Sequence, residues 1–185
     1  QAKRWPRVAE GTGKFEGQVV IVTGAAGGQG EMEAKMIAQQ GAKVYMADIE
    51  EEGLKRVEAA IIADGGEAVA FPMDVADEDA WQALVKKVLD ESGRLDVLVN
   101  NAGMCQNGTV LTETRESLTR IMDVDCWGVY NGMHYCAPAI IEAGGGTIVN
   151  TCSYQGTHFG PGSFIGYAMA KAAVMGMTRA AATDL

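Results

Sequence analysis

Short apolar runs alternate along the chain with longer stretches in which apolar residues recur at helical spacing. Five of the runs are rich in β-branched residues and are bounded by Gly, Asp or Asn, which is typical of parallel strands buried on both faces of a sheet. These runs are QVVIVTG at 18–24, KVYMAD at 43–48, EAVAFPMDV at 67–75, LDVLVNNAG at 95–103 and GTIVNTCS at 146–153.

Helical patterns fill the stretches between these runs. Leu54, Val57 and Ile61 recur at positions i, i+3 and i+7, so they predict one buried helix face. A wider apolar stripe follows, made of Trp81, Leu84, Val85, Val88 and Leu89. Asp77 lies just ahead of this stripe and is a suitable N-cap, because its side chain can accept hydrogen bonds from free backbone N–H groups.

A longer segment, residues 112–143, is also mostly helical in character. Pro138 should end or kink this helix near its end, because proline lacks an N–H group and its ring clashes with the preceding turn. Three glycines at 144–146 form the sharpest loop signal and separate this helix from the fifth apolar run. A last helix is expected to begin near Gly162 and to run to the end of the chain.

The order of these elements predicts an α/β fold. Strands that alternate with helices imply right-handed crossovers and a doubly wound parallel sheet of the Rossmann type. The chain has 185 residues, which suits a single domain. We expect this domain at residues 14–185, after a polar N-terminal leader at 1–13 that has basic residues but no apolar core of a signal peptide.

The composition narrows the range of partners. The formal net charge is −9 and the pI is about 4.7, so nucleic acids and anionic membranes are not expected to bind. No apolar stretch of the sequence is long enough to span a bilayer, and we expect a cytoplasmic protein. The four cysteines show no CxxC pairing and there are two histidines, so we expect no metal site and interpret the thiols as reduced and packed.

The run TGAAGGQG at residues 23–30 lies between the first apolar run and a predicted helix. Glycine allows a tight turn and lets the pyrophosphate of a dinucleotide approach the helix N-terminus, where free N–H groups and the dipole favour an anion. Gly24, Gly28 and Gly30 give the spacing GxxxGxG, whereas Gly24, Gly27 and Gly30 give GxxGxxG. The run alone leaves both spacings open, as well as a tight turn that binds no ligand.

Asp48 ends the second apolar run, at the spacing where a carboxylate meets the adenosine ribose in a dinucleotide site. It can accept hydrogen bonds from both ribose hydroxyls, and its charge repels the 2′-phosphate of NADP. No Arg or Lys lies in the glycine run or among the three residues after Asp48. NAD is therefore the predicted cofactor, with Gln29 and Ile49 as further contacts; a helix N-cap is the alternative role for Asp48.

Four further motifs follow along the chain. DV stands at 74–75, NNAG at 100–103 and Ser153 in SYQG, while YAMAK supplies Tyr167 and Lys171 as YxxxK. Together with the glycine run, these motifs resemble the short-chain dehydrogenase/reductase family, in its compact single-domain branch, in their order and nearly in their spacing.

The resemblance covers about residues 14–185 and selects one glycine spacing. NNAG accompanies GxxxGxG in the compact branch, whereas GxxGxxG belongs mostly to longer relatives that modify sugar nucleotides. The resemblance therefore implies that Gly24, Gly28 and Gly30 bind the cofactor, and that Gly27 is a tolerated small residue.

The resemblance also implies catalytic roles that the side chains permit. Tyr167 and Lys171 lie four residues apart, on the same side of a helix, and a nearby ammonium favours a phenolate. Tyr167 would take the hydroxyl proton of an alcohol while hydride passes to the nicotinamide, with Ser153 holding the substrate oxygen and Lys171 the nicotinamide ribose. By itself, YxxxK would fit an ordinary amphipathic helix.

The same resemblance assigns the remaining cofactor contacts. Asn101, Ala102 and Gly103 would pack near the adenine ribose. Asp74 would meet the adenine amino group, and the backbone of Val75 would meet the ring. A turn cap is the competing role for Asp74.

One departure from the family concerns the long helix. Where the family usually has asparagine in a VNxxG-like pattern, the stretch DVDCWGVY places Asp125. The family asparagine helps to hold a water in a proton relay from the lysine, largely through its backbone carbonyl. Asp125 keeps a carbonyl and adds charge near Lys171, which could preserve the relay, shift its pH range or weaken it. We count Asp125 with the catalytic residues and expect activity to survive.

A second departure concerns length. Family members usually continue beyond the YxxxK helix with two further strands and a mobile substrate loop. We expect the sequence to belong to a longer protein that supplies these C-terminal strands, because a sheet without them would expose apolar surface at its edge. A truncated form is the alternative, and little activity and poor solubility are expected of it.

The predicted activity is the interconversion of a secondary alcohol and a ketone. An apolar or cyclic substrate, such as a steroid, is suggested by the residues expected near the pocket, namely Met104, Cys105, Gln106, Tyr154, Gln155, Phe159 and Phe164. The long helix and the last helix resemble the family's dimer surfaces, so a homotetramer or homodimer is expected. The alternatives are an NAD-binding sensor without turnover and, more weakly, an epimerase or dehydratase.

Overall fold

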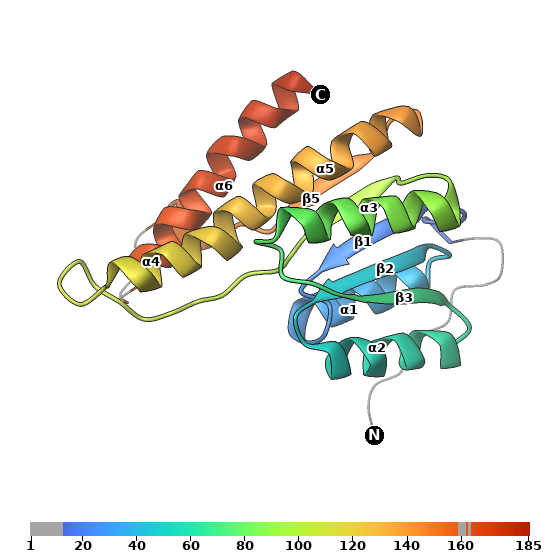
Figure 1. Ribbon diagram of the computed structural model, residues 1–185, viewed down its shortest axis with the longest axis horizontal. Coiled ribbons are helices and arrows are strands. Elements are labelled where there is room, and N and C mark those ends of the chain that lie inside the picture. Colours follow the sequence, from blue (N-terminus) through green and yellow to red (C-terminus); the bar gives the residue numbers. More distant parts are fainter. Residues whose placement is uncertain (1–12, 159–161, 163) are drawn as a thin grey trace.

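The computed structural model describes residues 13–158, 162 and 164–185 (Figure 1). The strands are β1 (Val19–Thr23), β2 (Lys43–Asp48), β3 (Glu67–Pro72), β4 (Val97–Asn100) and β5 (Thr147–Asn150). They form one parallel sheet in the order β3-β2-β1-β4-β5. The α/β, doubly wound, Rossmann-like sheet that the sequence predicts is therefore confirmed.

Helices cover both faces of this sheet (Figure 1). They are α1 (Gly28–Ala38), α2 (Glu51–Ala63), α3 (Glu78–Ser92), α4 (Arg115–Met122), α5 (Gly128–Glu142) and α6 (Ile165–Asp184). A π-helical turn, η1 (Asp123–Trp127), joins α4 to α5, and a 3-10 turn, η2 (Tyr154–Gly156), follows β5. No helix in the described part of the chain combines the length and apolar character needed to cross a membrane.

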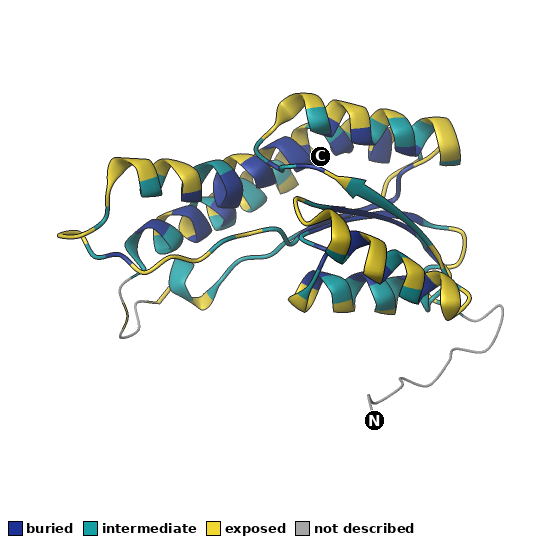
Figure 2. Cartoon of the chain, turned by 60° about the horizontal axis from the view of Figure 1, so that its bottom comes forward, coloured by how far each residue is buried: buried dark blue, intermediate teal, exposed yellow. Residues whose placement is uncertain are grey.

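The strands bury both of their faces, because successive side chains of a strand point in opposite directions. Val20 and Val22 of β1 pack in a core with residues of α1 and α2. Val19 and Ile21 of the same strand pack in a second core with residues of α3 and α5. Figure 2 shows the buried residues concentrated in the strands and on the inward sides of the helices. The near-continuous apolar runs are explained by this double burial.

The predicted helix faces are found where the sequence places them. Leu54, Val57 and Ile61 are all buried in α2, and Trp81 is buried at the start of the α3 stripe. The carboxylate of Asp77 accepts hydrogen bonds from the backbone N–H groups of residues 79 and 80, so it caps α3 as expected.

The helical segment expected at 112–143 is present as α4, η1 and α5, and α5 ends at Glu142 with Pro138 inside it. Ala139 and Ile140 are buried beyond the proline, and their packing holds the last turn in place. The final helix begins at Ile165 rather than near Gly162. The backbone N–H of Ile165 donates to the carbonyl of residue 108 at 3.0 Å, and the helix starts from this bridge.

The strand order reverses between β1 and β4. From β1 the chain builds outward through β2 to β3, and it then returns to place β4 and β5 on the other side of β1. In open α/β sheets, ligands bind in the crevice outside the carboxyl ends of the strands at such a reversal. The ends of β1, β2 and β4 therefore define where a cofactor is expected.

Candidate active site

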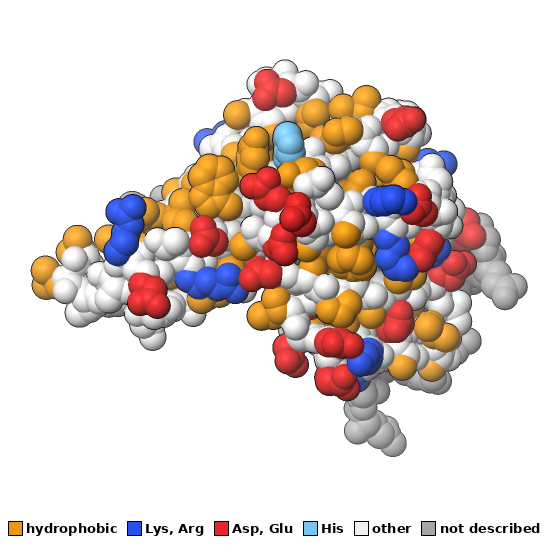
Figure 3. Space-filling model, viewed as in Figure 1, with side chains coloured by type: hydrophobic (Ala, Val, Ile, Leu, Met, Phe, Trp, Pro, Cys, Tyr) orange, Lys and Arg blue, Asp and Glu red, His pale blue; other side chains and the backbone are white. Residues whose placement is uncertain are grey.

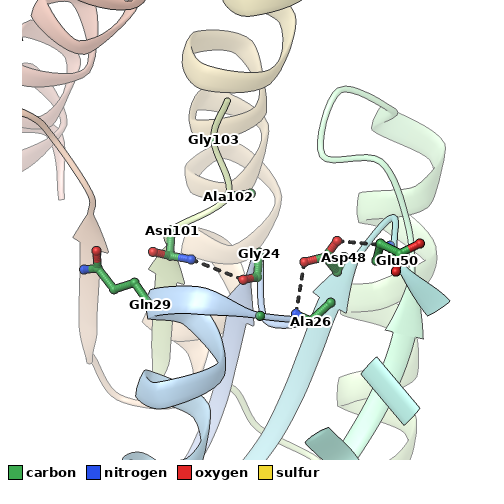
Figure 4. Close-up of a pocket in the computed structure, with 9 residues that line it drawn as sticks. Gly24, Ala26, Gln29, Asp48, Glu50, Asn101, Ala102 and Gly103 are labelled. Carbon is green, nitrogen blue, oxygen red and sulfur yellow. Dashed lines mark hydrogen bonds between the residues drawn. The ribbon is translucent and has the colours of Figure 1, made fainter. Parts of the chain in front are cut away.

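An open pocket of about 470 Å³ lies at the carboxyl ends of β1, β2 and β4 (Figure 4). It is lined by Gly24, Ala26, Gly27, Gln29, Asp48, Glu50, Asn101, Ala102 and Gly103. All of these except Ala26, Gly27 and Glu50 belong to the predicted cofactor-binding set. The fold thus gathers residues from three strand ends, from Gly24 to Gly103, around one pocket of a size that suits a small ligand.

The glycine loop needs glycine at three positions. Gly24 and Gly28 have φ angles of +67° and +55°, a left-handed conformation that other residues rarely adopt. A Cβ atom on Gly30 would lie 2.2 Å from the carbonyl oxygen of Gly24. At Gly27 the backbone is extended, with φ of −168°, and a Cβ would meet no atom within 4 Å. This backbone geometry supports the GxxxGxG spacing.

Thr23 ties the glycine loop to the end of β4. Its Oγ1 accepts hydrogen bonds from the backbone N–H groups of Asn101 and Ala102, both at 3.0 Å, and donates to the carbonyl of Val99 at 3.3 Å. The Asn101 side chain returns a hydrogen bond from Nδ2 to the Thr23 carbonyl at 3.0 Å. The sequence analysis missed Thr23, although its place directly before the first glycine is a usable signal.

Asp48 points its carboxylate toward the glycine loop (Figure 4). Oδ2 accepts a hydrogen bond from the Ala26 N–H at 3.0 Å, and Oδ1 accepts one from the Glu50 N–H at 3.0 Å. Glu50, and not Asp48, occupies the position before α2. The two backbone donors fix the orientation of the carboxylate and leave it lone pairs on the pocket side, where ribose hydroxyls could donate.

Several predicted cofactor residues are not among those that line this pocket, among them Asp74, Val75 and Ile49. The carboxylate of Asp74 accepts from the Ala76 N–H and pairs with Arg120, both at 3.0 Å, so it has the turn-capping role that the sequence left open. The Val75 carbonyl accepts a hydrogen bond from the Trp81 indole at 2.8 Å. The Ile49 side chain is exposed. Contacts of these residues with adenine remain predictions.

A buried ion pair lies beyond the Gly103 end of the pocket. Asp125 Oδ2 is 3.2 Å from Lys171 Nζ, and the two side chains are 0% and 3% exposed. Asp125 Oδ1 also accepts the Met104 N–H at 2.7 Å, and Lys171 Nζ donates to the Thr151 carbonyl at 3.1 Å. The alignment of Oδ2 with Nζ does not make a hydrogen bond, so this contact is primarily electrostatic.

Burial raises the pKa of the Asp125 carboxyl, because a charge loses its hydration there, while the Lys171 ammonium and the Met104 N–H oppose this shift. Asp125 belongs to the π-helical turn η1, and such bulges in helices are frequent at functional sites. Burial therefore outweighs the contacts that stabilise the charged carboxylate, in contrast to a surface ion pair.

Gly103 connects the pocket with this ion pair. A Cβ atom on Gly103 would lie 3.0 Å from Asp125 Oδ2 and 3.3 Å from Lys171 Nζ. The last residue of NNAG must therefore be small for the β4 loop to reach the charged pair. The geometry joins two groups of predicted residues, those of the cofactor pocket and those of the catalytic set.

Tyr167 and Ser153 complete the predicted catalytic set. Lys171 Nζ lies 5.5 Å from the centre of the Tyr167 ring, one turn away on α6, within the range of a cation–π contact. Ser153 Oγ accepts the Gln155 N–H at 3.2 Å and so begins η2. This turn lies against α6, because a Cβ on Gly156 would be 2.9 Å from the Lys171 carbonyl oxygen.

The residues expected near the substrate fall around these elements. Cys105 and Tyr154 are exposed, and Met104 is partly buried against two apolar clusters. Phe159 lies outside the described residues. Among the described residues, no three His, Cys, Asp or Glu side chains are grouped closely enough to hold a metal ion.

Comparison with known proteins bears on this arrangement. The family model described as short chain dehydrogenase matches residues 18–185. The chain belongs to the short-chain dehydrogenase family. The resemblance seen in the motifs is therefore confirmed. The members of this family are oxidoreductases that use nicotinamide cofactors.

This short-chain dehydrogenase is 38% identical over 172 residues to cyclohexanol dehydrogenase of Acinetobacter sp. (strain SE19), covering 92% of this chain and 68% of that relative. A solved short chain dehydrogenase from Mycobacterium smegmatis superposes with a TM-score of 0.89 at 34% identity, covering 98% of this chain and 76% of the other. An NAD+-bound xylitol dehydrogenase gives 0.88 at 31% identity, over 92% and 66%. The chain thus spans about two thirds of the length of two of these proteins.

Proposed function

We propose that this short-chain dehydrogenase interconverts a secondary alcohol and a ketone with NAD as the cofactor. The observation that carries the cofactor choice is the carboxylate of Asp48, which two backbone N–H groups orient at the pocket. Glu50 adds a second acidic side chain, and none of the residues that line the pocket is Arg or Lys. Ribose hydroxyls can donate to such a carboxylate, whereas a 2′-phosphate is repelled by it.

The glycine loop would hold the pyrophosphate. Gly24, Gly28 and Gly30 let the backbone turn at the N-terminus of α1, where unpaired N–H groups and the helix dipole favour an anion. Asn101, Ala102 and Gly103 form the facing wall. The residues present therefore fit a dinucleotide along the ends of β1, β2 and β4.

The proton transfer is assigned to Tyr167. A bound nicotinamide supplies the hydride acceptor or donor for the carbon of the substrate. Tyr167 takes the hydroxyl proton during oxidation and returns it during reduction, while Ser153 Oγ donates to the substrate oxygen and holds it in place. The Lys171 ammonium lies 5.5 Å from the centre of the Tyr167 ring, close enough to interact electrostatically with the phenol during this transfer.

Asp125 is proposed to position Lys171. Its carboxylate faces the ammonium at 3.2 Å, and the Thr151 carbonyl fixes the same ammonium from β5. These contacts aim the lysine side chain without consuming all of its three N–H donors. The remaining donors can serve the nicotinamide ribose and a proton relay, as the family resemblance implies.

For the substrate we propose an apolar or cyclic alcohol. The similarity to a cyclohexanol dehydrogenase supports this class. The steroid example remains a prediction from the sequence.

The decisive experiment is a panel of secondary alcohols assayed with NAD+ and with NADP+, by the absorbance of the reduced cofactor, together with direct titration of NADH. We expect turnover with cyclic alcohols and a clear preference for NAD+. Binding of NADH without turnover of any alcohol would favour the alternative, a dinucleotide-binding sensor. Equal use of NADP+ would contradict the role assigned to Asp48.

A second copy of the chain is the proposed protein partner. Trp127, Tyr130 and Ile141 expose 55%, 44% and 58% of their surface along η1 and α5, and Figure 3 shows hydrophobic side chains gathered over α4 and α5. Such a stripe supports a homodimer or homotetramer. A cytoplasmic location, and the lack of nucleic-acid, membrane and metal partners, stay predictions from the sequence.

A further inference from the structure

Helix α2 lies directly against the glycine loop behind the wall of the pocket. A Cβ atom on Gly53 would lie 2.8 Å from the Cβ of Ala26 and 2.9 Å from its carbonyl oxygen. One turn further along α2, Arg56 Nη2 donates a hydrogen bond to that same carbonyl oxygen at 2.9 Å. Gly53 lets α2 approach Ala26 closely, and Arg56 forms a hydrogen bond to the same residue. Both contacts of α2 with the glycine loop therefore meet at Ala26.

Glu31, in the first turn of α1, holds Arg56 in this position. Arg56 Nη1 and Nη2 donate to Glu31 Oε1 and Oε2 at 2.9 and 2.7 Å, a paired geometry that restricts the guanidinium in direction as well as distance. The Arg56 hydrogen bonds are the main cause that lowers the pKa of Glu31 to about 2, and Lys35 adds to this effect. The pair is therefore ionised throughout the neutral range.

Ala26 is consequently bonded on both sides. Its N–H donates to Asp48 Oδ2 at 3.0 Å, and its carbonyl accepts from Arg56 at 2.9 Å. These two bonds fix the backbone on either side of the Ala26 Cα atom. Since Ala26 is, within the described part of the chain, one of two backbone donors that orient the Asp48 carboxylate, a displacement of Ala26 would also turn Asp48.

We infer that Arg56 is a positioning residue for dinucleotide choice: through Ala26 it keeps the Asp48 carboxylate directed at the adenosine ribose. Glu31 balances the charge of the arginine and takes one N–H from each of its terminal nitrogens, which weakens the attraction of this cation for the 2′-phosphate of NADP. This inference rests on the proposed function, because it specifies how the same pocket selects NAD. It also explains how a nearby arginine is compatible with that choice.

Two mechanisms predict opposite changes when Arg56 is removed. If Arg56 acts through Ala26 and Asp48, its loss weakens the binding of NADH, which uses the ribose hydroxyls, more than the binding of NADPH. If Arg56 acts only as a positive charge through space, its loss weakens the binding of NADPH more, because NADPH carries the additional phosphate. The ratio of the two dissociation constants therefore separates the mechanisms.

The experiment titrates the complete protein with NADH and with NADPH by fluorescence, for the wild type, Arg56→Met and Lys55→Met. Lys55 is the matched control, since it lies on the same helix with the same charge and pairs only with Glu51 and Glu52 in the described structure. For Arg56→Met we expect the Kd of NADH to rise about tenfold, the effect of losing one charge-assisted hydrogen bond. The Kd of NADPH should change less than about twofold by the same argument, and Lys55→Met should leave both values unchanged.

Two further variants keep the test informative if Arg56→Met folds poorly. Arg56→Lys should recover part of the NADH affinity, because one ammonium can reach Ala26 or Glu31 but cannot reproduce the fork. Glu31→Gln leaves the arginine in place without its counter-charge, so NADPH should bind more tightly than to the wild type.

Unchanged NADH affinity in Arg56→Met, or a larger loss for NADPH than for NADH, would overturn the inference. A wild type that binds neither dinucleotide would instead overturn the proposed function itself.

Discussion

The two halves of the candidate site are built in different ways. The nucleotide half, at the ends of β1 and β2, consists mainly of backbone groups and glycines, and Gly28 and Gln29 in it are exposed. The catalytic half consists of side chains on η1 and α6, with Asp125 and Lys171 almost fully buried. The first half depends on backbone conformation and close approach, and the second depends on charges held away from water.

This difference determines how each half responds to substitution. In the nucleotide half, a substitution that adds an atom causes a steric clash wherever a neighbouring atom is too close, and the distance to that neighbour predicts how severe the clash is. In the catalytic half, each charge interacts more strongly because water is excluded, and removing one member leaves the other unpaired. The predictions below probe this contrast, from the largest expected effect to the smallest.

Tyr167→Phe removes only the phenolic hydroxyl from the catalytic half. Because proton transfer by a positioned side chain contributes about 10²- to 10⁴-fold, kcat for alcohol oxidation should fall by that range. The affinity for NADH should remain within about twofold, since no contact in the nucleotide half is altered. Steady-state assays with parallel NADH titrations check both statements, and retention of kcat would refute the assignment of Tyr167.

Gly30→Ala tests the steric requirement of the nucleotide half, with Gly27→Ala as its matched control. The new methyl group at residue 30 would lie 2.2 Å from the Gly24 carbonyl oxygen, whereas at residue 27 it would meet no atom within 4 Å. We expect Gly30→Ala to lower the free energy of unfolding by about 1–3 kcal/mol, as overpacking does. Denaturant unfolding measures this difference, and equal stability of the two variants would contradict the assigned spacing.

Asp125→Asn tests the charge balance of the catalytic half through stability. Since burial raises the folded-state pKa of Asp125 above its unfolded value, the wild type should lose stability relative to the variant as pH rises through the window between the two pKa values. The expected loss is about 1.4 kcal/mol for each pH unit of that window. Denaturant unfolding curves of both proteins, recorded from about pH 4 to 8, measure this loss, because a buried carboxyl titrates in that range. If the wild type instead became more stable than the variant as the pH rises, the prediction would be contradicted.

The same Asp125→Asn variant should change the pH dependence of catalysis more modestly. Ionisation of Asp125, whose pKa is raised by burial, changes the charge beside Lys171, so its removal should take one inflection out of the pH profile of kcat/KM for oxidation. The maximal turnover should change little, because asparagine can still accept the Met104 hydrogen bond. A gain of several orders of magnitude would show that Asp125 cripples the natural protein.

The sequence predicted the parts of the site that depend on local chain geometry. Gly24, Gly28 and Gly30 were selected with the help of NNAG, and the structure gives each a conformational or steric reason. The position of Asp48 at a strand end followed from the apolar run before it. Such features can be read from a sequence because neighbouring residues determine turns, caps and strand ends.

Long-range contacts were the part that the sequence did not reveal. Nothing near Arg56 marks it as a partner of the glycine loop, 30 residues earlier in the chain. The start of the last helix at Ile165 was also missed, because it goes with a hydrogen bond from the Ile165 N–H to the carbonyl of residue 108, far away in the sequence. Both cases depend on which elements the fold brings together.

By itself, the amino-acid sequence determined the order of strands and helices, the glycine spacing, the acidic residue after β2 and the Ser–Tyr–Lys motif order. Only the tertiary structure decided that Ala26 is bonded between Asp48 and Arg56, and that Asp125 faces Lys171 with both side chains almost fully buried. The physical reason is that backbone conformation is governed by residues close in sequence. Burial and charge pairing instead depend on elements that meet only when the sheet and its helices pack.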